Sequence, residues 1–586
     1  MTYDIVIRGG LVVDGTGGPS RVTDIGIIDG VIATVGLIPE IGTEEIDATD
    51  LVVAPGWVDI HTHYDGQVTW DPEVSPSSWH GVTTVVMGNC GVGFAPARSD
   101  GHDFLIELME GVEDIPGTAL HEGIDWQWES FPEYLDAVAT MPRTVDVLAQ
   151  IPHAALRAYV MGDRAHGDAT DDDVAQMAEL VEEALNAGAF GFTTSRTILH
   201  SSKHGLVPGT NAQNDELLAL ADAVGRAGHG VFQLISDHQG LGDDQGLHVE
   251  LAQRTGGTIT YTLAQSPIDP TAWTKALDEA ELQAANGLDL RPQVACRPTG
   301  MLYGLQTSLH PFITHPTIIK MRELPLSEQV ALLRQPEVRA QLLSEEATTD
   351  NFIYKSLMSR WNQIFPLGTV PDYEPPASQS IEALARAEGR DPYDVVLDYL
   401  LEDEGKAFLF APLAGYLDFD HEALRAMMEH PRSVVGLSDG GAHCGLICDV
   451  SFPTYLLSHW VKGRERGPRL SLEQAVHFQT QQTAEAYGLD DRGVLAEGKR
   501  ADINLIDIEQ LELKSPEMIF DLPGGGRRLV QRADGYVMTI QHGEVTYRYG
   551  EPTGNRPGQL VRSASSILQP QRCNKNPGTT TRVSNS

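Results

Sequence analysis

Two histidines separated by one residue, His61 and His63, are the residues of this chain best suited to metal chemistry. They end the apolar run 52–60, in which a Pro-Gly pair marks a turn, and such a run predicts a buried strand. Side chains two residues apart on a strand point to the same side, so both imidazoles can reach one point at its end. Imidazole nitrogen binds zinc and other transition metals well. The pair therefore predicts half of a metal site, and two ordinary histidines in a turn are the alternative.

Asp439 and Cys90 are the further candidate ligands, because each also follows an apolar run. Asp439 comes after the run 433–437 and precedes two glycines, whereas Cys90 comes after the run 82–87. A carboxylate can bind metal and carry a proton, and a thiolate is a strong zinc ligand that can bridge two metals. The alternatives are a turn-forming Asp-Gly for Asp439 and a small buried cysteine for Cys90. For Cys90 both interpretations stay open.

Polar residues near other predicted strand ends are candidates for substrate contacts. Arg196 and Arg297 each lie just past a predicted strand, and either guanidinium could hold a substrate carboxylate in a bidentate contact. A structural salt bridge is the alternative for both. His443 follows Asp439 by four residues in a glycine-rich loop and could either support the metal ligands or contact substrate, whereas His200 is interpreted as an ordinary loop residue.

Alternating strand and helix patterns in residues 58–485 must position these groups. Residues 171–187 form the clearest helix, with apolar residues on one face, Thr170 as a possible cap and Gly188 as a stop. Such alternation predicts an α/β fold with a metal-dependent (β/α)8 TIM-like barrel, whose active site lies at the carboxyl ends of its strands. The predicted strands are 83–87, 145–151, 189–194, 230–235, 258–263, 290–295, 407–410 and 434–437.

The remaining segments lack this alternation of strand and helix patterns. Residues 1–57 and 486–550 contain short apolar runs separated by glycine turns, so the two ends are predicted to form a small β-sandwich domain together. Residues 310–385 are rich in proline and are interpreted as an insertion over one barrel loop. Residues 551–586 are rich in Pro, Gly, Ser, Thr and Asn and predict a C-terminal tail with little core of its own.

Composition limits the partners of this protein. Its 586 residues include 41 Lys and Arg against 82 Asp and Glu, a formal net charge of −41 that would repel nucleic acid and anionic lipid. Five cysteines imply no disulfide framework, and the N-terminus lacks the pattern of a signal peptide. We therefore expect a cytoplasmic protein without nucleic-acid or membrane partners, whose assembly into homo-oligomers is left open.

The chain resembles the D-aminoacylase (N-acyl-D-amino-acid deacylase) branch of the amidohydrolase superfamily. The resemblance rests on the segments 4–10, 55–63, 81–91, 438–440 and 493–507, which together reach from the first predicted strand to the last domain. It implies a metal-bearing (β/α)8 barrel with a flanking β-sandwich. It also implies that His61, His63 and Asp439 bind metal and that Cys90 serves as a bridging or additional ligand.

The sequence departs from this family at three places. The fourth predicted strand ends Thr193-Thr194-Ser195-Arg196, without the lysine that many superfamily members carboxylate to bridge two metals. The histidines that D-aminoacylases use after strands 5 and 6 are absent at the expected positions, although His238 lies near the first and could contact substrate. One divalent metal per chain is therefore expected, with zinc as the preferred ion.

The resulting hypothesis is a metal-dependent hydrolase that cleaves a C–N bond of a small-molecule amide such as an N-acyl amino acid. Asp439 would accept a proton from water and deliver it to the departing nitrogen. The alternatives are a hydrolase of cyclic amides or imides and a non-catalytic scaffold that keeps the fold.

Overall fold

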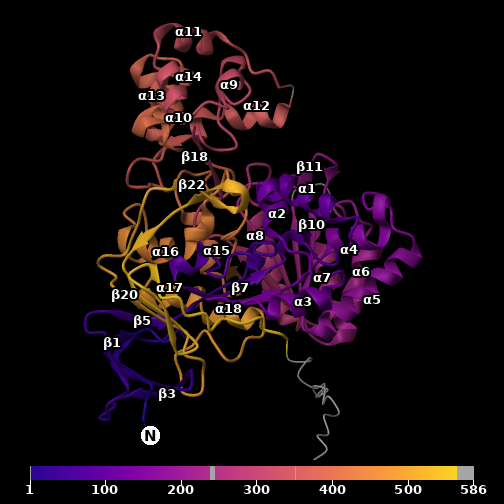
Figure 1. Cartoon of the computed structure of the whole chain (residues 1–586), viewed down its shortest axis with the longest axis vertical. Helices are drawn as coiled ribbons and strands as arrows, with labels where there is room; N and C mark the ends of the chain where they lie inside the picture. Colours follow the sequence, from indigo (N-terminus) through magenta and orange to yellow (C-terminus); the bar gives the residue numbers. More distant parts are fainter. Residues whose placement is uncertain (1, 238–243, 350, 564–586) are drawn as a thin grey trace, which may run out of the picture.

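The computed structural model describes residues 2–237, 244–349 and 351–563. It has three parts, which are a central β/α barrel, a β-sheet domain at one side and a helical lobe at the opposite end (Figure 1). None of the helices in these ranges has the length and apolar character that crossing a membrane requires.

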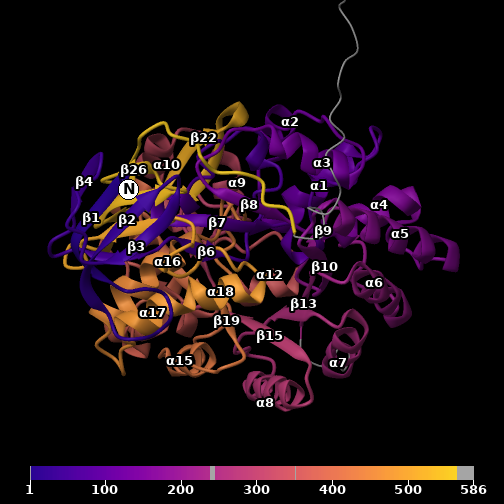
Figure 2. The same ribbon diagram turned by 90° about the horizontal axis from the view of Figure 1, so that it is seen from below.

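Parallel strands form the ring of the barrel. The sheet β6-β7-β8 joins the sheet β9-β10-β13-β14-β15-β19 where Phe190 donates a backbone hydrogen bond of 2.8 Å to Ala149. The ring closes where Thr62, after β6, pairs with Gly440, after β19. Because β8 and β9 are consecutive parts of one strand, the predicted (β/α)8 barrel is confirmed (Figure 2). The strands are β6 (Trp57–Asp59), β7 (Val82–Met87), β8 (Asp146–Ala149), β9 (Ile151–Pro152), β10 (Gly191–Arg196), β13 (Val231–Ser236), β14 (Thr258–Thr262), β15 (Asp289–Val294) and β19 (Val434–Val435).

Helices follow the barrel strands and surround the ring (Figure 2). Helix α5 has the predicted bounds, because Thr170 and Asp173 form a reciprocal capping box at its start and Gly188, with φ of 114°, ends it. The surrounding helices are α1 (His102–Glu113), α2 (Gly117–Gly123), α3 (Phe131–Ala139), α4 (His153–Met161), α5 (Asp171–Ala187), α6 (Asn214–Ala227), α7 (Asp244–Thr255), α8 (Ala272–Ala285), α15 (Glu422–Met428), α17 (Leu472–Phe478) and α18 (Gln481–Ala486).

Both ends of the chain contribute to one β domain, as predicted. Strand β5 pairs antiparallel with β20, and this pair joins the N-terminal and C-terminal strands into one sheet. Isoleucines of the first half, such as Ile25, share one buried core with residues of the second half, such as Ile503. The strands are β1 (Ile5–Val12), β2 (Arg21–Ile28), β3 (Val31–Gly36), β4 (Glu44–Asp47), β5 (Val52–Pro55), β20 (Ile503–Ile506), β25 (Tyr536–Gln541), β26 (Glu544–Arg548) and β27 (Glu551–Pro552).

A helical lobe stands between β15 and α15 and has its own hydrophobic core (Figure 1). It extends beyond the predicted insertion 310–385 on both sides. The run 407–410, predicted among the barrel strands, instead falls in the lobe's sheet, because β18 pairs antiparallel with β16 and β17. The lobe contains β16 (Gly300–Tyr303), α9 (Pro316–Met321), α10 (Leu326–Leu333), α11 (Pro336–Ser344), α12 (Phe352–Met358), β17 (Phe365–Pro366), α13 (Ile381–Glu388), α14 (Pro392–Leu400) and β18 (Leu409–Pro412).

The first residues of the predicted C-terminal tail pack against the barrel. Val147 of β8 donates to the Gln559 carbonyl, and Val561 donates back to the Val147 carbonyl, both at 2.9 Å. Strand β9, rather than β8, pairs with β10, so this part of β8 has backbone groups that the C-terminal segment can satisfy. Residues 551–563 of the predicted tail are therefore part of the folded structure, beginning with β27 of the β domain, and residues 564–586 lie outside the described residues.

A buried ion pair ties the C-terminal half to the barrel wall. Arg492 donates to Asp146 at 2.7 Å and to Thr84 at 2.9 Å, and Arg500 lies 2.9 Å from the same carboxylate. The Asp146 side chain is 0% exposed. Because water cannot replace a lost partner there, this carboxylate depends on the two guanidinium groups.

We expect Arg492→Met to lower the free energy of unfolding by about 3 kcal/mol, the low end for breaking a buried pair, because Arg500 remains. The shift of the urea midpoint measures this loss. Arg386→Met, at a residue whose side chain is 77% exposed, is the control and should leave the midpoint unchanged. Equal midpoints for the two variants would contradict the assignment.

Candidate metal centre

The barrel brings the four predicted ligands together at the carboxyl ends of three strands. His61 and His63 follow β6, Cys90 lies in the turn after β7, and Asp439 follows β19. His61 Nε2 lies 3.2 Å from Cys90 Sγ and 3.4 Å from Asp439 Oδ1, and His63 Nε2 lies 3.8 Å from the same oxygen. Four donor atoms from three separate segments therefore surround one small volume.

The separations between these atoms are compatible with ligands of one metal ion. Zinc binds nitrogen and oxygen at about 2.0–2.2 Å and sulfur at about 2.3 Å, which separates neighbouring ligands by roughly 3.3–3.8 Å. The separations above lie in or near that range, and one donor each from His61, His63 and Cys90 lies within 4.8 Å of the other two. Two imidazoles, a thiol and a carboxylate suit zinc or a similar ion.

Each histidine presents its Nε2 to the centre and its Nδ1 to a different partner. His61 Nδ1 lies 2.6 Å from the Gln293 side-chain oxygen on β15. His63 Nδ1 lies 3.4 Å from Glu113 Oε1 at the end of α1. Metal-binding histidines commonly donate their second N–H to a carbonyl or carboxylate, which fixes the ring and leaves the other nitrogen free to bind. Both rings are thus oriented as metal ligands would be.

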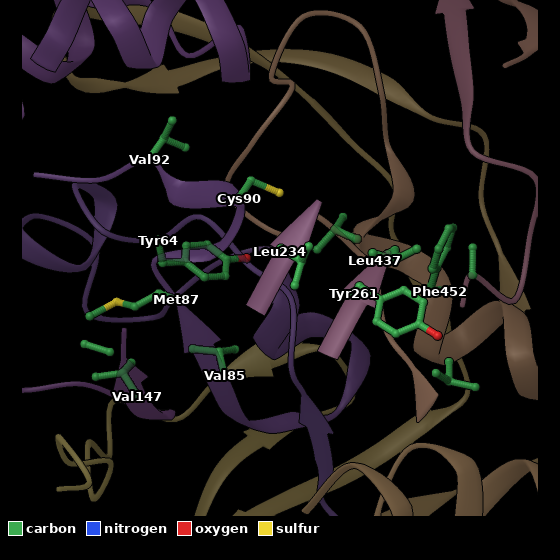
Figure 3. Close-up of a cluster of buried hydrophobic side chains, with 14 of the residues drawn as sticks. Tyr64, Val85, Met87, Cys90, Val92, Val147, Leu234, Tyr261, Leu437 and Phe452 are labelled. Carbon is green, nitrogen blue, oxygen red and sulfur yellow. The ribbon is translucent and has the colours of Figure 1, made fainter. Parts of the chain in front are cut away.

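Local backbone conformation also places the site residues. Cys90, Asp439 and His443 have φ of 57°, 51° and 51°, in the left-handed region that non-glycine residues rarely adopt. The two metal-facing segments hold each other, because Asp439 donates to the His61 carbonyl at 3.1 Å and His63 donates to the Gly440 carbonyl at 2.7 Å. Figure 3 shows Cys90 at the margin of the apolar side chains that fill the barrel below it.

Electrostatics favour a positive charge at this point. Burial alone would lower the pKa of His61, but the Cys90 sulfur and the Asp439 carboxylate raise it to about 9. Burial would raise the pKa of Asp439, but His63 and His61 hold it well below its usual range. Buried anionic groups thus stabilise charge on the imidazoles, and a bound cation would satisfy the same groups.

The weaker predicted contacts have different surroundings. His443 Nε2 lies 3.5 Å from Glu113 Oε2, so His443 belongs to the centre. Arg196 is the half-buried last residue of β10, and it donates to the Ala212 carbonyl at 3.0 Å. His238 lies outside the described residues.

Arg297 has a structural environment instead of the predicted substrate contact. Its side chain is 1% exposed and lies 2.8 Å from Asp449. Its guanidinium carbon also lies 3.8 Å from the centre of the Tyr373 ring. A guanidinium enclosed by a carboxylate and an aromatic face cannot also reach a substrate.

Three residues of the centre were missed by the sequence analysis. Glu113 and Gln293 contact the second nitrogens of His63 and His61, and His200 interacts electrostatically with Glu113 and His63. His200 donates to or accepts from Ser195 at 3.0 Å, and burial lowers its pKa to about 4. Nothing in the sequence around Glu113 distinguishes it from other acidic helix residues, because its role depends on where the C-terminal end of α1 docks.

A second cluster of two histidines and a carboxylate has its charge already balanced. Glu374 Oε2 lies 3.0 Å from His459 Nε2 and 3.6 Å from His421 Nδ1. Arg464, which is 0% exposed, lies 3.1 Å from Glu374 Oε1 and 2.9 Å from Glu422. A guanidinium beside the carboxylate would repel a metal ion, so we interpret this cluster as a buried ion network.

Comparison with known proteins agrees with this geometry. The amidohydrolase family profile matches residues 44–547, which is most of the chain. The chain belongs to the amidohydrolase family. The predicted family and the predicted hydrolysis of C–N bonds other than peptide bonds are therefore confirmed.

Among similar proteins, an N-acyl-D-aspartate deacylase of Alcaligenes xylosoxydans xylosoxydans is 27% identical, with 96% of each chain covered. The structure of an N-acyl-D-glutamate deacylase of Bordetella bronchiseptica, complexed with zinc and a phosphonate inhibitor, has a TM-score of 0.65 and 23% identity. It covers 96% of this chain and 100% of that one. A D-aminoacylase with a binuclear metal centre has a TM-score of 0.63 and 22% identity, with the same coverage.

We expect Cys90→Ser and Cys90→Ala to reduce metal retention, because a ligand thiolate is lost in both variants. Metal content after gel filtration against a weak chelator measures the effect. Cys296→Ala is the matched control, since Cys296 is also buried but its sulfur faces the Phe452 carbonyl at 3.5 Å. Full metal occupancy in both Cys90 variants would remove Cys90 from the ligand set.

Proposed function

We propose that this protein is a metal-dependent deacylase that hydrolyses the amide bond of an N-acyl amino acid. The observation that carries the proposal is the convergence of His61, His63 and Cys90, whose donor atoms lie within 4.8 Å of one another. The Asp439 carboxylate lies beside them, 3.4 Å from His61 and 3.8 Å from His63. Family membership and the named activities of the deacylase relatives support the substrate class. An intact donor set argues against a non-catalytic scaffold.

These four side chains would hold one divalent ion, with zinc preferred for the mixed nitrogen, sulfur and oxygen donors. Such an ion supplies a Lewis acid for the amide carbonyl and acidifies a water molecule. The Gln293 and Glu113 side chains keep both imidazoles turned toward it. Buried apolar neighbours around Cys90 exclude bulk water from this side of the centre.

Asp439 is the proton carrier in this proposal. Its side chain is 16% exposed, the most accessible of the four donors, and its low pKa keeps it ionised at neutral pH. A carboxylate in that state can accept a proton from the attacking water and deliver it to the departing nitrogen. Arg196, His238 and His443 are the residues we propose for substrate contacts.

The groups on the other side of Cys90 support a single metal per chain. Strand β13 places Gln233 there, and its side-chain oxygen accepts a hydrogen bond of 3.0 Å from the Cys90 backbone. A neutral amide engaged in this way is a poor substitute for a histidine ligand. We therefore propose that the centre is mononuclear, unlike the binuclear centre named for the D-aminoacylase structure.

Elemental analysis of protein purified without added metal should give about one divalent ion per chain, because three or four protein ligands define a single position. Addition of excess zinc followed by gel filtration should not raise this ratio. Two tightly held ions per chain would contradict the mononuclear proposal and direct attention to Gln233 and the residues after β13.

Asp439→Asn should lower kcat for an N-acyl amino acid by roughly 10²–10⁴-fold, the usual contribution of a positioned acid–base group. Circular dichroism and the unfolding midpoint should show that the fold persists. Asp103→Asn, at an 82% exposed carboxylate of α1, is the matched control. Turnover is measured on paired D and L substrates together with lactams and hydantoins, and hydrolysis of the cyclic amides alone would overturn the proposed substrate class.

A further inference from the structure

Glu113 occupies a position that is unfavourable for a carboxylate. It is the last residue of α1, and its side chain is 1% exposed. Neither of its carboxylate oxygens has a hydrogen-bond partner among the described residues. The C-terminal end of a helix carries partial negative charge, so a carboxylate there is repelled as well as desolvated. Such a residue requires a compensating positive charge nearby.

Two imidazoles face this carboxylate from opposite segments of the centre. His63 Nδ1 lies 3.4 Å from Oε1, and His443 Nε2 lies 3.5 Å from Oε2. His63 Nδ1 is itself without a hydrogen-bond partner in the described part of the chain. These distances are slightly longer than ordinary hydrogen bonds, so a small movement would give each oxygen one N–H donor.

The surrounding backbone fixes Glu113 relative to both histidines. The His443 backbone N–H donates to the Glu113 carbonyl. The next residue, Asp114, accepts a hydrogen bond from the Gly445 backbone at 3.1 Å and one from Ser308 at 2.7 Å. The end of α1 is thus attached to the loop that carries Asp439 and to the base of the lobe.

We propose that Glu113 is a positioning residue that orients a metal ligand and a substrate-side histidine with one carboxylate. An N–H···O contact from His63 Nδ1 leaves Nε2 as a lone-pair donor toward the metal. The same contact from His443 Nε2 leaves its Nδ1 as the acceptor, on a side chain that is 21% exposed. This inference rests on the proposed function for the metal, and it assigns a role to a residue outside the barrel strands.

The second nitrogens of the two histidines face partners of different charge. His61 Nδ1 faces a neutral amide, Gln293, whereas His63 Nδ1 faces the carboxylate of Glu113. A carboxylate raises the basicity of the ligand it contacts more than an amide does. His63 should therefore contribute more strongly to metal retention than the amide-supported His61.

Glu113→Gln tests the proposal because a neutral amide has one acceptor oxygen, so it cannot offer a charged oxygen to each of the two N–H groups. We expect zinc dissociation into a chelator to accelerate by about 10–100-fold, the usual effect of losing such a partner. The d–d absorption spectrum of the cobalt-substituted protein should shift. Glu113→Asp should restore part of the metal retention, and Glu110→Gln, an exposed residue of the same helix, should change neither measurement.

The metal-free protein provides a second readout that a merely structural residue would not give. Removing a buried carboxylate that accepts no hydrogen bond should leave Tm unchanged or raise it by about 1–3 °C in Glu113→Gln. A fall in Tm together with wild-type zinc dissociation and an unaltered cobalt spectrum would overturn the proposal. Wild-type protein that holds no zinc or cobalt would instead contradict the proposed function itself.

Discussion

The junction between the ends of β6 and β19 is the constraint on which the metal centre depends. Backbone hydrogen bonds from Asp439 to His61 and from His63 to Gly440 close the barrel and join the two ligand segments in the same few residues. The same contacts therefore close the ring and place the candidate ligands. A change that opened the ring here would separate the imidazoles from the carboxylate, although the segments are 376 positions apart in the chain at His63 and Asp439.

The centre combines strained backbone with closely spaced anionic groups. Left-handed backbone at Cys90, Asp439 and His443 costs of order 1–3 kcal/mol for each residue. The carboxylates of Asp439 and Glu113 are held near each other around His63. The rest of the barrel must supply the stability that these residues lack, and its apolar interior below Cys90 does so through burial (Figure 3). This division between a stable scaffold and a strained site is common among enzymes.

Buried contacts connect the lobe and the C-terminal segments to the barrel near the centre. Asp114 connects the end of α1 to Ser308 at the base of the lobe. Arg297, enclosed by Asp449 and Tyr373, joins the end of β15 to the segment after β19 and to the lobe's return to the barrel. The Glu374 network with Arg464 provides another buried connection between these parts. Leu302, Tyr373 and Phe410 at the base of the lobe also belong to the apolar core of the barrel, whereas the helices of the lobe enclose a separate core.

The sequence alone identified those residues that a local sequence pattern marks. Apolar runs ending in His61, Cys90 and Asp439 located strand ends, and the cap and stop of α5 followed from Thr170 and Gly188. Parallel strands in a barrel must place such ends on one face, so the sequence also predicted that these residues would meet. Composition and spacing could not predict which distant groups would complete the site.

Only the tertiary structure decided the roles of Glu113, Gln293 and Arg297. Glu113 and Gln293 became partners of the two histidines because the end of α1 docks on the loop after β19 and because β15 pairs with β19. Arg297 lies against Asp449 instead of making its predicted substrate contact. The run 407–410 likewise became a lobe strand because β16 and β17 offered it antiparallel partners. Side-chain pairing across distant segments depends on how whole elements pack, and no periodicity or motif in the chain encodes that packing locally.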